Sequence, residues 1–135
     1  MRVLVDSNIV ISAIGWDGNE RKLLFTEHNI DVDFFICEKT IEEFTSVLER
    51  KKFSHLDRKK VTRFTLILLD LFTIVSAKGN LKIVKEDPDD DVIINCAIDN
   101  KIEYVVTGNN HLLKLKEFKG IKILKTIELL KIFGE

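Results

Sequence analysis

Short, continuously apolar segments alternate with helical segments along the whole chain, and this alternation most constrains the fold. Apolar strands without an alternating polar face are buried on both sides, so helices must cover both faces of their sheet. The expected strands are residues 3–5, 34–37, 104–107 and 120–124, with further extended segments at 72–75 and 81–84. We therefore expect an α/β protein with three layers, α/β/α, around a mainly parallel central sheet.

The segments between these strands have helical periodicity and helix-start signals. The expected helices are residues 7–14, 20–28, 40–50, 57–71, 87–100, 110–116 and 126–133. A chain of 135 residues fits one domain, so residues 1–135 are expected to form a single domain. The most apolar stretch, residues 66–75, contains Asp70 and is too short to span a bilayer. We expect no membrane association and a cytoplasmic protein, with Cys37 and Cys96 as reduced core thiols.

Acidic residues lie where the expected strands end. Asp6 directly follows the first strand, Glu43 lies early in the helix after the second, and Asp90 opens the helix at 87–100. Ligands of parallel sheets bind beyond the carboxyl ends of the strands. Asp90 shares a helical stripe with Ile94 and Ala97, so its carboxylate points inward, where it would be costly without a partner. Oxygen ligands suit Mg²⁺ or Mn²⁺, so these three acids are expected to hold a divalent metal.

Acids at helix starts also have a simpler role, because they cap the helix and interact favourably with its dipole. Capping explains one or two of the five acids within residues 86–91, and it would explain Asp6 taken alone. It does not explain the inward direction of Asp90. In the helix at 40–50, Glu42 points away from the apolar face and Glu43 lies nearer its edge. Glu43 is therefore the better candidate for the site.

Four segments together resemble the motifs of PIN domains in their order and spacing. They are VLVDSN at 3–8, TIEEFTSVL at 40–48, DPDDDVIINCA at 87–97 and YVVTGNNHLL at 104–113. The resemblance covers essentially the whole chain and is greatest to small prokaryotic members, which include VapC-type toxins of toxin–antitoxin pairs. It implies a PIN-like fold and a ribonuclease that cuts RNA endonucleolytically with Mg²⁺ or Mn²⁺. Asp6, Glu43 and Asp90 would be its catalytic and metal-binding acids, and a small antitoxin protein would be its partner.

The fourth motif departs from the family pattern, because Asn109 stands where an aspartate is usual. The resemblance therefore implies a site with three acids, in which a second metal is held less tightly. Asn8 and Thr107 are expected to hydrogen-bond to the ligands, and Asp91 and Asn109 to support the site. The alternative is a PIN-fold module that binds RNA or protein with weak or lost catalysis.

A receiver-type phosphoacceptor domain is a further alternative, because such domains are doubly wound, of similar length, and hold Mg²⁺ with acids at the same edge. They need an acceptor aspartate at the end of a middle strand. The second strand here runs into Cys37, Glu38 and Lys39, so the sequence disfavours this alternative.

Basic residues follow the helix that carries Glu43, although the formal net charge of the chain is only −1. An RNA-binding surface must therefore be local. The candidate RNA-binding residues are Arg50, Lys51, Lys52, Arg58 and Lys59. The next helix is apolar on too many sides for one sheet face, which predicts a homodimer through the region from Phe64 to Phe72.

Overall fold

The structure is a computed structural model that describes residues 1–50, 54–84 and 88–135. In these residues a six-stranded sheet has the order β3-β2-β1-β4-β6-β5. Its strands are β1 (Arg2–Val5), β2 (Asp33–Cys37), β3 (Thr73–Val75), β4 (Tyr104–Val106), β5 (Glu117–Phe118) and β6 (Ile121–Leu124). Neighbouring strands are parallel except for the pair β5–β6, so the expected mainly parallel sheet is confirmed.

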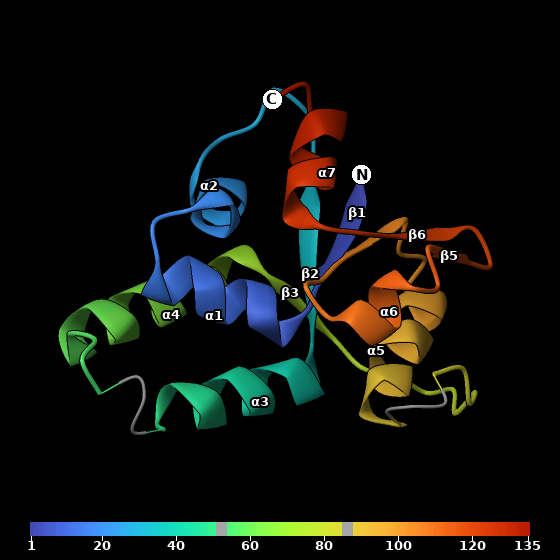
Figure 1. The fold of residues 1–135 in the computed structure, drawn as a ribbon, viewed down its shortest axis with the longest axis horizontal. Coiled ribbons are helices and arrows are strands. Elements are labelled where there is room, and N and C mark those ends of the chain that lie inside the picture. Colours follow the sequence, from blue (N-terminus) through green and yellow to red (C-terminus); the bar gives the residue numbers. More distant parts are fainter. Residues whose placement is uncertain (51–53, 85–87) are drawn as a thin grey trace.

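Helices cover both faces of this sheet. They are α1 (Ser7–Gly15), α2 (Asn19–Phe25), α3 (Glu38–Leu48), α4 (Arg58–Leu71), α5 (Pro88–Asp99), α6 (Asn110–Leu113) and α7 (Thr126–Ile132). Figure 1 shows the sheet nearly edge-on, with α1 and α4 on one side and α5 and α6 on the other. Val3 and Val5 belong to the core under the first group, and Leu4 to the core under the second. The strands are therefore buried on both faces, which explains their continuous apolar sequence.

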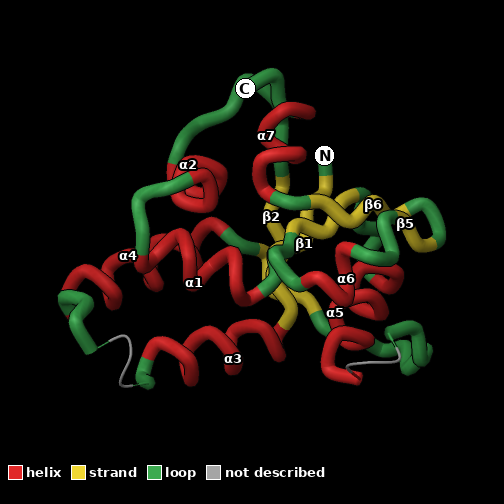
Figure 2. The backbone as a smooth tube through the Cα atoms, viewed as in Figure 1, coloured by secondary structure: helices red, strands yellow, loops and turns green. Residues whose placement is uncertain are grey.

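Strand β1, the first in the chain, lies in the middle of the sheet, and the later strands are placed on both sides of it. Strand β1 pairs with β2 on one side and with β4 on the other, and the later strands lie outward from these. The gap beyond the carboxyl ends of β1 and β4 is thus the switch point where ligands of such sheets bind. In Figure 2, β2 runs into α3 on one side of this edge, while α5 lies on the other side. This edge is where the sequence places its acids.

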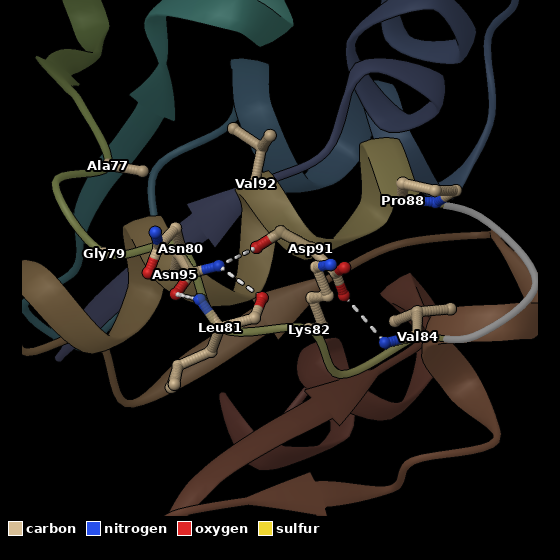
Figure 3. Close-up of a pocket in the computed structure, with 10 residues that line it drawn as sticks. All are labelled: Ala77, Gly79, Asn80, Leu81, Lys82, Val84, Pro88, Asp91, Val92 and Asn95. Atoms are coloured by element: carbon tan, nitrogen blue, oxygen red, sulfur yellow. Dashed lines mark hydrogen bonds between the residues drawn. The ribbon is translucent and has the colours of Figure 1, made fainter.

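The strand expected at residues 81–84 is absent, so that prediction is wrong. The chain from 78 to 84 instead runs along α5, and three side chains spaced four residues apart on this helix accept its backbone N–H groups. Figure 3 shows two of them, Asp91 and Asn95. The acceptors are Asp99 Oδ2 for Lys78 and Gly79 (2.6 and 2.8 Å), Asn95 Oδ1 for Leu81 (3.0 Å), and Asp91 Oδ1 for Ile83 and Val84 (2.8 and 2.7 Å). Because these side chains satisfy the backbone, the segment needs no neighbouring strand.

A short antiparallel hairpin ends the sheet, and the sequence analysis did not predict its first strand, β5. Lys119 and Gly120 between the two strands both have positive φ, 50° and 84°. A two-residue turn with this geometry matches the twist of an antiparallel pair. Strand β6 therefore begins at Ile121, one residue later than expected. Within the described ranges, none of the helices is long and apolar enough to cross a bilayer.

Candidate active site

Asp6 lies at the switch point and is the most buried acid of the site, with 5% of its surface exposed. Its Oδ1 accepts a hydrogen bond from the Ser7 backbone N–H at 2.8 Å, and its Oδ2 accepts from Thr107 Oγ1 at 2.7 Å and Asn8 Nδ2 at 3.1 Å. Burial raises the pKa of the Asp6 carboxyl above its ordinary value, and these hydrogen bonds oppose the rise. Asp6 therefore caps α1 and also presents a costly buried charge at the sheet edge.

Glu43 faces the same place from α3. Its Oε2 accepts a hydrogen bond from Ser7 Oγ at 3.1 Å. Burial raises the pKa of Glu43, the Ser7 hydrogen bond opposes that rise, and the nearby charge of Asp6 adds to it. Glu42, its neighbour in the sequence, is exposed. Glu43 thus faces the site and Glu42 faces solvent, as their positions on the helix require.

Asp90 reaches the site from the first turn of α5 and is 7% exposed. Its two carboxylate oxygens both accept from Asn109 Nδ2, each at 3.0 Å. Ile94 and Ala97, which share its helical stripe, are fully buried. Asp90 therefore points inward at the start of the helix, and a neutral amide is its partner there.

Neutral side chains connect these three acids into one hydrogen-bonded network. Ser7 joins Asp6 to Glu43, and the Asn109 backbone N–H donates to Thr107 Oγ1 at 3.0 Å, which joins Asp6 to Asp90 through Asn109. Over residues 1–50, 54–84 and 88–135, no three His, Cys, Asp or Glu side chains converge closely enough to form a preformed metal site. The network instead has two parts: Ser7 links Asp6 to Glu43, and the neutral Asn109 binds Asp90.

Asn8 and Thr107 hold this network in place. Asn8 donates to Asp6, and its Oδ1 accepts from the Gly108 backbone N–H at 2.8 Å. A Cβ at Gly108 would lie 3.3 Å from Asn8 Oδ1, so the absence of a side chain permits this close approach. Thr107 is fully buried between Asp6 and the backbone of Asn109. Asn8 and Thr107 therefore both donate hydrogen bonds to the carboxylate of Asp6.

Asp91, the other residue expected to support the site, has a different position. Its Oδ1 accepts from Ile83 and Val84, so its carboxylate faces the segment at 78–84 (Figure 3). That segment also lines an apolar cavity of about 750 Å³ together with Pro88 and Val92 on α5. Asp91 therefore holds the chain that leads toward α5 and does not join the network of Asp6, Glu43 and Asp90.

The candidate RNA-binding residues lie in different environments. Arg50 lines an open depression of about 460 Å³ that also contains Ser7 and Glu43. Arg58 Nη1 donates to the Leu48 carbonyl at 2.8 Å and so ties α4 to the end of α3. Lys59 is exposed on α4. Lys51 and Lys52 lie outside the described residues.

Two residues of the site were missed by the sequence analysis, Ser7 and Lys39. Ser7 was not among the expected site residues, yet its hydroxyl contacts Glu43. Lys39 Nζ lies 2.7 Å from Asp89 Oδ1, so this ion pair joins α3 to α5 across the acidic edge. A signal was present in the sequence, because Lys39 precedes Glu43 by four residues and therefore shares its helix face.

Comparisons with known proteins identify the family to which this arrangement belongs. Residues 2–111 match the PIN domain, and the chain therefore belongs to the PIN-domain family. Among solved structures it is similar to VapBC2 from Rickettsia felis bound to a DNA fragment from their promoter, with a TM-score of 0.57 and 18% identity. That match covers 93% of this chain and 98% of the other, and it supports the shared fold. No curated protein sequence matches the chain.

The resemblance inferred from the four sequence motifs is thus confirmed. Proteins of the PIN-domain family are generally ribonucleases, and they generally use divalent metals.

Proposed function

We propose that this protein is a metal-dependent ribonuclease that hydrolyses phosphodiester bonds within RNA. The observation that carries the proposal is the hydrogen-bonded network that joins Asp6, Glu43 and Asp90 at the switch point of the sheet. These acids come from α3, α5 and the end of β1, which are far apart in the sequence. Capping of individual helices does not require that the three acids belong to one network, whereas binding of one shared metal ion does.

The chemistry of these side chains fits a hard divalent cation, Mg²⁺ or Mn²⁺. The available ligand atoms are carboxylate oxygens, which both metals prefer. Asp6 is buried, and burial raises its pKa because the charged carboxylate loses contact with water. A bound cation would stabilise that charge. Asp6, Glu43 and Asp90 would hold the ion, and a bound divalent metal supplies activation of water and neutralisation of charge on the phosphate.

The chain's own residues position these ligands. Thr107 and Asn8 orient the Asp6 carboxylate, Ser7 orients Glu43, and Asn109 orients Asp90. Such hydrogen bonds fix ligand direction and tune ligand charge. Glu43, with its raised pKa, is the acid of the network that is most open to solvent and is the candidate for accepting a proton from the attacking water.

The direct test is cleavage of labelled RNA with Mg²⁺ or Mn²⁺, before and after addition of EDTA. We expect cleavage that EDTA abolishes and that fresh metal restores. Asp6→Asn and Asp90→Asn should lose it, whereas Asp70→Asn, at an exposed position on α4, should retain it. Activity that persists in EDTA would contradict the metal mechanism.

The second candidate function is a PIN-fold module that binds RNA or protein and has lost catalysis. Asn109 favours it, because its amide adds no charge and its nitrogen already occupies both oxygens of Asp90. Calorimetry with Mn²⁺ distinguishes the two functions. Heat of binding that disappears in Asp6→Asn supports the nuclease, and absence of binding at millimolar Mn²⁺ supports the module.

We infer further that the chain acts as the toxin of a toxin–antitoxin pair, with a small antitoxin protein as its partner. Its structural similarity to a chain of a VapBC2 complex supports this role. Induced expression in a bacterial host should arrest growth with the wild type and not with Asp6→Asn. Co-expression of a small protein encoded beside this chain should relieve the arrest and co-purify with it.

A further inference from the structure

One face of α3 carries an ordered series of polar side chains past the candidate site. Lys39, Glu43 and Ser46 follow one another at intervals of four and three residues on α3, and such intervals bring side chains onto one helix face. Arg50 follows two residues after the helix ends at Leu48. All four line the same open depression of about 460 Å³, and Ser7 and Asp89 close its other side. The depression therefore runs along the helix and contains the candidate catalytic acid Glu43.

One positive charge lies in the first turn of this face and the other just beyond its end, with Glu43 between them. The helix from Lys39 to its last residue, Leu48, is about 14 Å long, and Arg50 follows it. A nucleic-acid strand in a helix advances about 3.4 Å per phosphate, so this length accommodates several consecutive nucleotides. Lys39 and Arg50 are thus placed to hold phosphates on opposite sides of the one that faces Glu43.

The acids in the depression restrict where an anionic strand can lie. Glu42, Glu43 and Asp89 line it too and repel phosphates. Lys39 reduces this repulsion, because its ammonium lies 2.7 Å from Asp89 Oδ1. The ion pair is open to water, with 36% of the Lys39 side chain and 73% of the Asp89 side chain exposed. Water screens such a pair, so Lys39 can exchange Asp89 for a phosphate at little cost.

We propose that this face of α3 is the track for the phosphate backbone of a single-stranded RNA, with Lys39 and Arg50 as phosphate-binding residues and Ser46 as a hydrogen-bond donor between them. The proposal rests on the ribonuclease function proposed above and adds the path of its substrate. The described residues that line the depression include one pair of cations, Lys39 and Arg50, beside the acids, which suits one strand. A duplex is recognised across two successive grooves, which needs a second basic row.

Arg58 and Lys59 do not belong to this track. The Arg58 guanidinium donates to the Leu48 carbonyl, and Lys59 projects from the first turn of α4 without lining the depression. Lys131 is exposed on α7 and does not line the depression. Lys131→Gln removes the same charge as Lys39→Gln and is the matched control for non-specific attraction.

The experiment is fluorescence anisotropy with a labelled single-stranded RNA of mixed sequence, in Ca²⁺ and in EDTA, over a series of salt concentrations. Lys39→Gln and Arg50→Gln should each weaken binding several-fold and lower the slope of log affinity against log salt by about 0.7 per lost phosphate contact. Asp89→Asn should tighten binding, because it removes a repulsive charge and releases Lys39. Lys131→Gln should leave affinity and slope unchanged.

Three results would overturn the track: no RNA binding by the wild type, equal losses in Lys131→Gln and Lys39→Gln, or equal affinity for a duplex of the same sequence. A cleavage assay with Mg²⁺ or Mn²⁺ distinguishes an error in the proposed track from an error in the proposed ribonuclease activity. RNA that is bound through Lys39 and Arg50 but never cut supports the track and contradicts the nuclease. RNA that is cut with unchanged KM by both variants supports the nuclease and contradicts the track.

Discussion

Asn109 donates from its amide nitrogen to both carboxylate oxygens of Asp90, at 3.0 Å each. Its orientation is fixed from the other end, because Oδ1 accepts from the His111 backbone N–H at 2.9 Å and so caps α6. The nitrogen therefore has to face Asp90. A neutral donor thus takes the place that a fourth carboxylate usually has in this family, and it stabilises the charge of Asp90 directly.

Asn109→Asp should destabilise the metal-free protein and increase the effect of metal. The new carboxylate keeps the cap on His111 but places a second negative charge against Asp90, where two close carboxylates cannot both ionise freely. A divalent cation relieves that repulsion. Thermal melts should show a lower Tm than wild type in EDTA and a larger rise in Tm with Mn²⁺.

Asn109→Ala is the control for this substitution, because it removes the donor to Asp90 without adding charge. It also loses the helix cap, which costs about 1 kcal/mol of stability. Its Mn²⁺-induced rise in Tm should stay below that of Asn109→Asp. Equal rises in the two variants would place residue 109 outside the metal site.

Thr107→Val should weaken metal binding and catalysis while preserving shape. Its hydroxyl donates to Asp6 at 2.7 Å and accepts from the Asn109 backbone N–H at 3.0 Å, and valine does neither. Loss of such a supporting hydrogen bond typically costs about 10–100-fold in metal affinity or activity. The unsatisfied N–H adds roughly 1–3 kcal/mol of destabilisation. Calorimetry with Mn²⁺ and denaturant melts measure the two effects separately.

Thr126→Val provides the matched control. The Thr126 hydroxyl is also buried, but within the described residues it has no hydrogen-bond partner. Its replacement should leave metal affinity unchanged and stability equal or higher. If both valine variants lower metal affinity alike, the effect of Thr107 is not specific to the network.

The sheet could be predicted from sequence because burial on both faces leaves a direct signature, continuous apolar strands between helices. The same signature failed at residues 81–84, where Leu81, Ile83 and Val84 are apolar but form no strand. Their backbone N–H groups donate to Asp91 and Asn95, which can accept them only because α5 lies beside the segment in the folded protein. Hydrogen bonds between a side chain and the backbone of a segment distant in the sequence leave no local sequence pattern.

The positions of the candidate acids were predictable for a related reason. Helical periodicity distinguishes Asp90 from Asp91 and Glu43 from Glu42, and in the structure Asp91 faces the segment at 78–84 while Glu42 is exposed. The direction of the Asn109 amide was not predictable, because it depends on both Asp90 and the start of α6. Contacts across the sheet edge, such as Lys39 with Asp89, likewise require the assembled fold.

Asp91→Ala should loosen the segment at 78–84. It deprives the Ile83 and Val84 N–H groups of their acceptor, at a cost of roughly 1–3 kcal/mol. Hydrogen exchange should show lost protection at these two amides. Asp89→Ala, two residues earlier and exposed, should change stability by about 0–1 kcal/mol. Retained protection in Asp91→Ala would show that Asn95 and Asp99 alone hold the segment.

A homodimer should form through the outer face of α4. Leu66, Ile67 and Leu71 are exposed there by 62%, 46% and 42%, and Ile74 on the neighbouring edge strand by 49%. A contiguous apolar face of this kind is typical of an interface. Leu66→Asp should convert the dimer to a monomer in sedimentation or light scattering. Ile127→Asp, at an exposed apolar position on α7, should not. A wild-type monomer at high concentration would contradict this prediction.

The last prediction concerns pH, because burial raises the pKa of both Asp6 and Glu43 in the folded protein. The folded state then binds more protons than the unfolded state at pH values between the ordinary and the raised pKa. The stability of the metal-free protein should therefore fall as pH rises through this window, which starts near the ordinary value of 3.8 for Asp6. Asp99, whose pKa is lowered, acts in the opposite direction at lower pH, so a difference between variants is needed.

Asp6→Asn isolates this effect. The variant cannot ionise at residue 6, so its stability relative to wild type should increase with pH across the window and then level off. The amide also places an N–H₂ group near Asn8 Nδ2 or the Ser7 N–H, but that cost does not depend on pH. Asp70→Asn, on the surface of α4, provides the background. Because metal binds the deprotonated acids, the Mn²⁺-induced rise in Tm should grow with pH in wild type and be much smaller in Asp6→Asn. Equal metal-induced shifts in both proteins at every pH would show that Asp6 is only a helix cap.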